Sequence, residues 1–172
     1  MVLVGPPGAG KSTVGRLLAD RLGVDFTDID DLIVDRAGRS ISEIFITDGE
    51  QVFRELEERA VAAALTGRDG VLALGGGAVL SAQTRALLRG SRVVFLSVRM
   101  AEGVRRTGLS SARPLLAGVN PRATFAALLD ARLPLYREVA TTEVATDGRT
   151  PEEVTEDVLV AMQSCRGQLA GS

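Results

Sequence analysis

The chain lacks histidine and tryptophan, and its 172 residues include one lysine and one cysteine. Without histidine, a general base must be a carboxylate, and a metal site built from imidazoles is excluded. The single cysteine, Cys165, cannot form an intramolecular disulfide, which suits a reducing compartment, so we expect a cytoplasmic protein. Aromatic residues make up 3% of the chain, so a core drawn from its 45% apolar residues must be aliphatic.

A charge excess and a long apolar segment are missing as well. Twenty basic residues stand against 22 acidic ones, and a formal net charge of −2 argues against general nucleic-acid binding. The longest apolar run, Ala60–Leu65, is far shorter than the ~20 residues that cross a bilayer, and the first residues do not resemble a signal peptide. We expect a single domain over residues 1–172, acting as a monomer without a membrane or nucleic-acid partner.

The one lysine, Lys11, lies in the segment Gly5-Pro6-Pro7-Gly8-Ala9-Gly10-Lys11-Ser12, whereas the 19 other basic residues are arginine. This segment matches G-x-x-x-x-G-K-[ST], a loop whose backbone N–H groups hold nucleotide phosphates. Lysine suits the position because its compact ammonium acts as a point charge between phosphates, where a planar guanidinium fits poorly. The predicted nucleotide-binding residues are Gly8, Ala9, Gly10, Lys11, Ser12 and Thr13, with the Ser12 hydroxyl as a Mg²⁺ ligand.

Apolar strands alternate with amphipathic helices along the chain. Strands are expected at Val2–Val4, Asp25–Thr27, Val71–Leu74, Arg92–Val98 and Glu143–Ala145. Helices are expected at Lys11–Leu22, Asp31–Ala37, after a capping box at Ser40, at Glu50–Thr66, Ala82–Leu88, Met100–Thr107, Pro121–Arg137 with a bend at Pro134, and from Thr150 to about Arg166, followed by a frayed tail. This order predicts a parallel sheet covered on both faces by helices, with ligands at the carboxyl ends of the strands.

Several polar or glycine-rich segments follow predicted strands, and they are the candidates for chemistry on that rim. Asp28 and Asp30 are two residues apart, so on an extended chain both carboxylates face the same side; one could hold Mg²⁺ through water and the other a substrate hydroxyl. The alternative for Asp30 is a helix cap. Gly75-Gly76-Gly77 indicates close approach of backbone to a ligand, or else a loose turn.

Arg54 and Arg113 are candidate ligand-binding residues, and their place in the fold decides whether they can act as such. Arg54 lies among acids on a predicted helix, a pattern that alone is typical of a solvated face with i,i+3 and i,i+4 ion pairs. Arg113 lies in Gly108–Asn120, a segment rich in small residues that reads as a long loop. Such a loop is often a lid, and its arginine could reach a γ-phosphate.

Taken together, these residues resemble the shikimate kinase family. The resemblance rests on Gly5–Thr13, Asp28-x-Asp30, Phe53-Arg54, Gly75-Gly76-Gly77, Arg113-Pro114-Leu115-Leu116 and Arg132-x-Pro134-Leu135-Tyr136, which occur in order over nearly the whole chain. It implies a three-layer α/β/α fold of the nucleoside-monophosphate-kinase class, with a five-stranded parallel sheet and a mobile lid. It also implies transfer of the ATP γ-phosphoryl group to the 3-hydroxyl of shikimate, with Mg²⁺.

The resemblance also implies a role for each matched residue. Asp30 would bind the shikimate hydroxyls and act as the base, and Arg113 would be the lid arginine on the phosphates. The remaining implied roles are Arg54 and Arg132 on the shikimate carboxylate, Gly76 and Gly77 on the substrate, Phe45 and Phe53 lining its pocket, Arg106 and Arg149 beside the adenine, and Asp28 with Ser12 at Mg²⁺. The substrate-binding region would span about 28–60 and the lid about 108–124.

One departure from the family pattern is Pro6-Pro7, where a single proline is more usual. Two alternative functions stay open on the sequence. One is another small kinase with the same phosphate loop, acting on gluconate or a nucleoside monophosphate. Lys11-Ser12-Thr13, rather than a Lys-Gly-Thr run, argues against adenylate kinase. The other is a nucleotide-dependent switch that binds a protein partner, which would leave Arg54 and Arg132 without a purpose.

Overall fold

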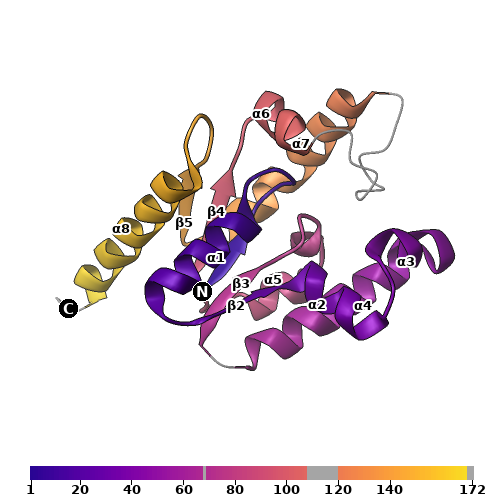
Figure 1. Cartoon of the computed structure of the whole chain (residues 1–172), viewed down its shortest axis with the longest axis horizontal. Coiled ribbons are helices and arrows are strands. Elements are labelled where there is room, and N and C mark those ends of the chain that lie inside the picture. Colours follow the sequence, from indigo (N-terminus) through magenta and orange to yellow (C-terminus); the bar gives the residue numbers. More distant parts are fainter. Residues whose placement is uncertain (68, 108–119, 170–172) are drawn as a thin grey trace.

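The computed structural model describes residues 1–67, 69–107 and 120–169, and a parallel β-sheet forms its centre (Figure 1). Within this part of the chain the sheet has five strands in the order β2-β3-β1-β4-β5. The strands are β1 (Val2–Val4), β2 (Asp25–Asp28), β3 (Gly70–Ala73), β4 (Val93–Ser97) and β5 (Thr142–Ala145). The order places β1 at the centre, so the loop that follows it leaves the middle of the sheet.

Helices connect the strands and cover the sheet on both faces. They are α1 (Lys11–Leu22), α2 (Ile29–Ala37), α3 (Ile41–Thr47), α4 (Gly49–Leu65), a short 3₁₀ helix η1 (Ala78–Leu80), α5 (Ala82–Leu87), α6 (Met100–Thr107), α7 (Pro121–Val139) and α8 (Pro151–Leu169). Helices α1 and α8 lie beside each other on one face (Figure 1). The other face carries α2, α4, α5 and α7. The predicted three-layer α/β/α architecture with a five-stranded parallel sheet is therefore confirmed.

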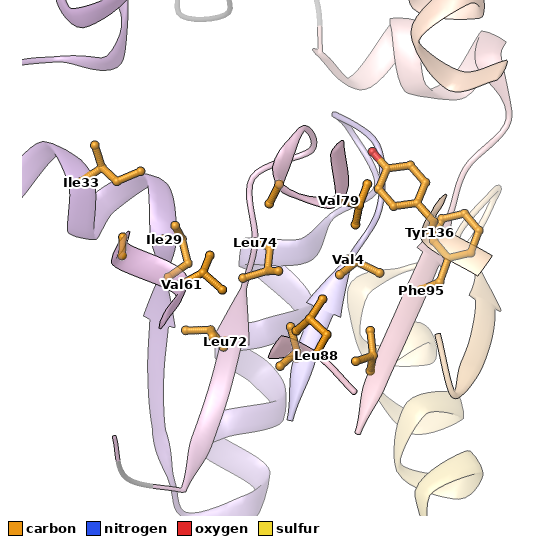
Figure 2. Close-up of a cluster of buried hydrophobic side chains, with 14 of the residues drawn as sticks. Val4, Ile29, Ile33, Val61, Leu72, Leu74, Val79, Leu88, Phe95 and Tyr136 are labelled. Carbon is orange, nitrogen blue, oxygen red and sulfur yellow. The ribbon is translucent and has the colours of Figure 1, made fainter. Parts of the chain in front are cut away.

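Strand residues alternate between two hydrophobic clusters because successive side chains point to opposite faces of a sheet. Val4 and Phe95 belong to the cluster beneath α2, α4 and α7, which Figure 2 shows with Leu74, Val79 and Tyr136. Leu3 and Leu96, one residue away in each strand, pack instead against α1 and α8. Because both faces are covered, the three central strands β3, β1 and β4 are buried apolar runs, as the sequence indicated, whereas the edge strands β2 and β5 are more polar and more exposed.

Most predicted element boundaries hold to within a residue or two, and the differences have local causes. Strand β2 continues to Asp28, and α2 begins at Ile29 rather than Asp31, because the Asp28 side chain caps the helix by accepting a hydrogen bond from the Asp30 N–H at 3.0 Å. The capping box at Ser40 forms as expected: the Ser40 hydroxyl accepts from the Glu43 N–H, and the Glu43 carboxylate accepts from the Ser40 N–H.

At the carboxyl-terminal end of the chain two helices run further than predicted. Helix α7 includes Pro134 and continues to Val139. Helix α8 extends to Leu169, so the expectation of a frayed tail from Gly167 is wrong for its first residues. None of the helices in the described part of the chain is both long and apolar enough to cross a membrane.

Two leucines on α1 give a test of this packing. Leu18 is fully buried against the sheet, so Leu18→Ala is expected to lower the free energy of unfolding by about 2–5 kcal/mol. Leu22 lies one turn further along the same helix and is 40% exposed, so Leu22→Ala is expected to cost less than about 1 kcal/mol. Urea denaturation monitored by circular dichroism measures both, and equal losses would contradict the orientation of α1.

Candidate active site

The phosphate loop runs from the end of β1 to the start of α1, as predicted. Gly5, Gly8 and Gly10 have φ angles of 151°, 79° and 86°, in the region that side chains rarely adopt. This backbone turns consecutive N–H groups toward a common point at the N-terminus of α1, where the helix dipole also favours an anion. Lys11 Nζ donates to the carbonyls of Gly5 at 2.8 Å and Pro6 at 3.1 Å, so its ammonium lies over the loop.

Neighbouring backbone packs so closely on this loop that two of its glycines, Gly5 and Gly8, have no room for a side chain. A Cβ on Gly5 would collide with the carbonyl oxygen of Leu96 at the end of β4. A Cβ on Gly8 would lie 2.8 Å from the carbonyl oxygen of Gly103 on α6. Helix α6 is therefore held directly against the phosphate loop, which fixes the distance between them.

Asp28 and Asp30 lie beside the loop, but not in the arrangement that an extended chain predicts. Asp28 ends β2 and caps α2, and its Oδ2 accepts a 2.5 Å hydrogen bond from the Ser12 hydroxyl. Asp30 lies in the first turn of α2, so the expectation that both carboxylates share one face of a strand is wrong. The capping residue is Asp28, which leaves the Asp30 side chain to point toward the glycines after β3.

Arg54 on α4 is held by two carboxylates of its own helix. Its Nη1 donates to Glu57 at 2.6 Å, while Nε and Nη2 donate to Glu50 at 3.3 and 3.1 Å. The i,i+3 and i,i+4 pairs expected from the sequence are present, but the solvated face is not: the Arg54 side chain is 19% exposed and that of Glu57 is 3% exposed. Only Glu50, at 49%, is a surface partner.

Glu57 is a buried acid to which the sequence reading gave no role. Burial raises the pKa of Glu57, and the Arg54 guanidinium opposes this, while the nearby Asp30 carboxylate raises the pKa further. Burial lowers the pKa of Arg54, but Glu57 and Glu50 more than offset that effect, so its pKa lies above the ordinary value. The result is a charged cluster at low exposure, which holds the Arg54 guanidinium in one orientation.

The three glycines after β3 each leave space for a different neighbour, which explains the run. A Cβ on Gly75 would collide with the Glu57 carboxylate and lie 2.8 Å from Asp30 Oδ1. A Cβ on Gly77 would collide with the Arg54 guanidinium. The loose-turn alternative does not describe this segment, because η1 follows it at once and each glycine faces a packed group.

The middle glycine, Gly76, connects this segment to α7 and to the phosphate loop. Its carbonyl accepts hydrogen bonds from Arg132 Nη1 at 3.2 Å and from the Tyr136 hydroxyl at 2.5 Å. Arg132 is 5% exposed and Tyr136 is fully buried, and burial raises the pKa of Tyr136 to about 12. On its other side Gly76 packs against Pro7, where a Cβ would lie 3.1 Å from the proline ring.

Phe53 lies beside Arg54 and packs against Phe45 of α3. Phe53 is buried, and its ring centroid lies 4.8 Å from that of Phe45 in a tilted arrangement. The Arg54 guanidinium carbon lies 5.3 Å from the centre of the Phe53 ring. The predicted substrate-binding residues between 28 and 60 therefore lie together with Gly76, Gly77 and Arg132.

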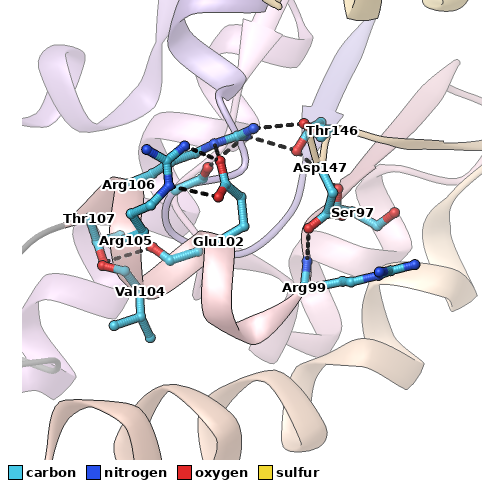
Figure 3. A network of polar contacts seen from close by, with 11 residues as sticks. Ser97, Arg99, Glu102, Val104, Arg105, Arg106, Thr107, Thr146 and Asp147 are labelled. Atoms are coloured by element: carbon cyan, nitrogen blue, oxygen red, sulfur yellow. Dashed lines mark hydrogen bonds and ion pairs between the residues drawn. The ribbon is translucent and has the colours of Figure 1, made fainter. Parts of the chain in front are cut away.

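The predicted adenine side lies at the opposite edge of the phosphate loop, where a cavity of about 480 Å³ is found. Its lining includes Gly10, Thr13, Arg106 and Arg149, together with other residues of α1, α6 and the turn before α8. Arg149 pairs with Asp157 on α8, and Arg106 bonds to Glu102 and Thr146 (Figure 3). A second cavity of about 510 Å³ lies at the other end of the sheet and contains none of the predicted site residues.

Arg113 and most of the predicted lid, residues 108–119, lie outside the described residues. The predicted lid and the predicted role of Arg113 therefore stay predictions. The remaining candidates converge on the carboxyl ends of the strands, as parallel topology requires. The sequence did not predict that Glu57 belongs to the site, and it gave Tyr136 no function. The burial of Glu57 could have been predicted from its place on the helix. Glu57 falls on the same helical stripe as Phe53, Ala60 and Val61, which are all buried.

Comparisons with known proteins agree with this geometry. The family model described as shikimate kinase matches residues 7–163. A shikimate kinase of Saccharopolyspora erythraea is 71% identical over 92% of this chain and 90% of its own length. The solved structure of a shikimate kinase from Acinetobacter baumannii in complex with shikimate covers 95% of this chain and 92% of its own, with a TM-score of 0.93 and 38% identity.

A gluconokinase structure from Sinorhizobium meliloti also matches, with a TM-score of 0.58 and 19% identity over 98% of this chain and 94% of its own. Identity this low shows a shared fold and nothing about the acceptor. The family model, by contrast, spans most of the chain, and the similarity to the Saccharopolyspora protein extends over nearly the full length of both. The chain belongs to the shikimate kinase family.

Proposed function

We propose that this protein transfers the γ-phosphoryl group of ATP to the 3-hydroxyl of shikimate, giving shikimate 3-phosphate and ADP. Family membership makes the chain an ATP-dependent phosphotransferase of the shikimate pathway. The observation that carries the choice of acceptor is the cluster of Arg54, Arg132 and Asp30 around the glycines that pack on the phosphate loop. Two guanidiniums and one carboxylate match a small polyhydroxylated carboxylate.

Arg54 and Arg132 bind the shikimate carboxylate in this proposal. Arg54 has a displaceable partner in Glu50, because a half-exposed ion pair is weak and exchanges easily with a ligand carboxylate. Its second partner, Glu57, is buried and stays in place to orient the guanidinium. Phe45 and Phe53 form an apolar wall, and the backbone of Gly76 and Gly77 lies against the ring of the substrate.

Asp30 is the base for the acceptor hydroxyl. The hydroxyl oxygen forms a bond to the γ-phosphorus as the bond from that phosphorus to the β,γ-bridging oxygen breaks, and ADP leaves. The hydroxyl proton passes to the Asp30 carboxylate. Because phosphoryl transfer needs mainly positioning and charge stabilisation, a carboxylate that fixes the hydroxyl suffices, and histidine is not needed.

The phosphate loop holds the other reactant. The backbone N–H groups of Gly8–Thr13 and the N-terminus of α1 bind the phosphate oxygens. On binding, Lys11 exchanges its bonds to the Gly5 and Pro6 carbonyls for bonds to the β- and γ-phosphates. Arg106 and Arg149 flank the adenine, and Arg113 in the proposed lid, about residues 108–124, adds a further positive charge at the γ-phosphate.

Ser12 and Asp28 are the residues that would hold Mg²⁺. A hydroxyl and a carboxylate whose oxygens lie 2.5 Å apart beside the phosphate loop are the oxygen donors that this ion prefers, so the pair fits it. Within the described residues no cluster of three or more acids forms a metal site. Magnesium needs none, since it takes one or two protein ligands and keeps several waters. When bound, the ion neutralises charge on the β- and γ-phosphates.

Two further expectations belong to the proposal. The enzyme is proposed to be a monomer built from one domain over residues 1–172. Shikimate and ATP are small molecules, and the balanced charge of the chain gives no reason to expect a nucleic-acid partner. A cytoplasmic location agrees with the single cysteine, which has no partner for a disulfide within the chain.

The acceptor can be tested directly by measuring ADP release with ATP and Mg²⁺ in the presence of shikimate, gluconate or AMP. We expect release that depends on shikimate and little with the other two. Faster turnover with gluconate or AMP would replace the proposal with another small kinase. Release that is the same with and without any acceptor would favour a nucleotide-hydrolysing switch.

Arg54→Ala tests the carboxylate clamp. We expect the variant to bind shikimate more weakly by about 1.5–3 kcal/mol, the usual range for a hydrogen bond to a charged group, with ATP affinity unchanged. Isothermal titration calorimetry measures both ligands. Arg59→Ala is the matched control, because Arg59 lies on the same helix with its side chain 76% exposed. Native shikimate affinity in Arg54→Ala would remove this residue from the site.

Asp30→Asn tests the base. The substitution keeps the shape of the side chain but removes its ability to take a proton, so we expect turnover to fall by roughly 10²–10⁴-fold while Mg·ATP still binds. Asp31→Asn is the control, since Asp31 is adjacent in α2, largely exposed and paired loosely with Arg16 at 3.6 Å. If both variants keep native steady-state turnover, Asp30 has no role in proton transfer.

A further inference from the structure

Arg106 is fixed along its edges by three segments of the chain that are distant in sequence (Figure 3). Its Nε donates to Glu102 at 2.7 Å, one turn earlier on α6. Its Nη2 donates to the Thr146 carbonyl at 2.7 Å, and its Nη1 donates to the Thr146 hydroxyl at 3.0 Å and to the Gly8 carbonyl at 3.4 Å. These bonds use all three nitrogens of the guanidinium.

Glu102 is the acidic member of this network. Its Oε1 accepts from both Arg106 and Arg105, and its Oε2 accepts from Arg105 at 2.8 Å. Hydrogen bonds from Arg105 and Arg106 lower the pKa of Glu102 to about 2, so the carboxylate is ionised at neutral pH. The side chain is 19% exposed, and both of its oxygens point to arginine.

Thr146 supplies the uncharged end of the network. It is 2% exposed, and its hydroxyl donates to the Ser97 carbonyl at 3.1 Å while accepting from Arg106. Because Ser97 ends β4 and Thr146 follows β5, this hydroxyl is anchored to the sheet itself. Arg106 is therefore tied to the sheet on one side and to α6 on the other.

With its N–H edges committed, Arg106 offers a ligand mainly the flat faces of the guanidinium. Arg106 lines the cavity of about 480 Å³ between α6, the phosphate loop and the turn before α8, so a ligand in this cavity would meet those faces. A planar, weakly hydrated guanidinium stacks well on an aromatic ring, and a purine base is such a ring. An arginine left free to rotate would also turn its N–H groups toward the phosphates.

We propose that Glu102 is a positioning residue of the nucleotide site, which acts by holding Arg106 face-on to the base of ATP. Glu102 also lines the cavity, but its two oxygens accept from Arg105 and Arg106, so in this proposal it acts through Arg106 and not through a bond of its own to ATP. The inference rests on the proposed function in one respect, because it takes the cavity to be the place of the adenine. Its consequence is that Glu102 contributes to binding of the base and not to binding of the phosphates.

Whether removal of the Glu102 carboxylate strengthens or weakens ligand binding distinguishes a positioning role from simple electrostatic repulsion. A carboxylate near the phosphate loop repels a polyphosphate, so its removal should strengthen phosphate binding if charge alone mattered. Loss of a positioning residue should instead weaken binding of a ligand that has a base. Two probes distinguish these cases: ATP, which carries the base, and inorganic tripolyphosphate, which does not.

The experiment measures the affinity of Glu102→Ala and Glu102→Gln for both probes by calorimetry with Mg²⁺, in the absence of shikimate. We expect Glu102→Ala to bind ATP about tenfold more weakly, and tripolyphosphate as well as or better than the unmodified protein. Glu102→Gln should recover most of the ATP affinity, because its amide oxygen can still accept from Arg106 Nε. In steady state, Glu102→Ala should raise KM for ATP with little change in kcat or in KM for shikimate.

Glu138→Ala is the matched control. Glu138 holds Arg85 at 3.2 Å, and Arg85 also donates to the backbone carbonyls of Val79 and Leu80, so the network is of the same kind but lies away from the cavity. This variant should bind ATP with native affinity. It also shows how much the loss of an acid–arginine pair by itself changes the affinity for ATP.

Two results would overturn the inference. One is native ATP affinity in Glu102→Ala. The other is an equal weakening for ATP and tripolyphosphate, which would mean that the phosphate loop itself had been disturbed. Because calorimetry uses the nucleotide alone, a failure of the shikimate assay would leave this comparison interpretable, and the two proposals can fail separately.

Discussion

Close packing of bare backbone at the carboxyl ends of the central strands is the constraint on which the rest of the site depends. Gly5 touches the end of β4, Gly8 touches α6 through Gly103, and Gly76 touches Pro7. Any side chain at these points would push the layers apart. The phosphate loop thus has two functions, because the glycines whose positive φ angles aim its N–H groups at an anion also lack the Cβ that would keep its neighbours away.

The two buried charged side chains of the described residues, Glu57 and Arg132, both make hydrogen bonds on this scaffold. Glu57 would be costly alone at 2% exposure, yet it lies against Arg54, with Arg132 also lowering its pKa. The Asp30 carboxylate acts in the opposite direction and raises the pKa of Glu57. The base proposed for the acceptor hydroxyl and the acid that anchors Arg54 therefore lie in one cluster, both beside Gly75.

The sequence predicted the sheet, most helices and the phosphate loop because these depend on local pattern: apolar runs, helical spacing and glycine positions. It failed where tertiary packing decides. The spacing of Arg54, Glu55 and Glu57 on a helix is compatible with an exposed or a buried stripe, and the sheet above α4 decides that Glu57 is buried. The bond between Glu102 and Arg106 is local, but the orientation of the guanidinium also depends on Thr146, which is forty residues from Arg106 in sequence.

At both the proposed shikimate end and the proposed nucleotide end of the site, an arginine is held in one orientation, but a different part of it is left for the ligand. In each, an acid on the same helix grips an arginine one turn away and leaves one part of it for a ligand. Glu57 holds Arg54 by Nη1, so the edge formed by Nε and Nη2 faces only the surface acid Glu50 and suits a carboxylate. At Arg106 the edges are occupied by protein groups and the faces remain, which suits a flat base. In the proposed site, the protein groups that hold each arginine thus decide which part of it is left for a ligand.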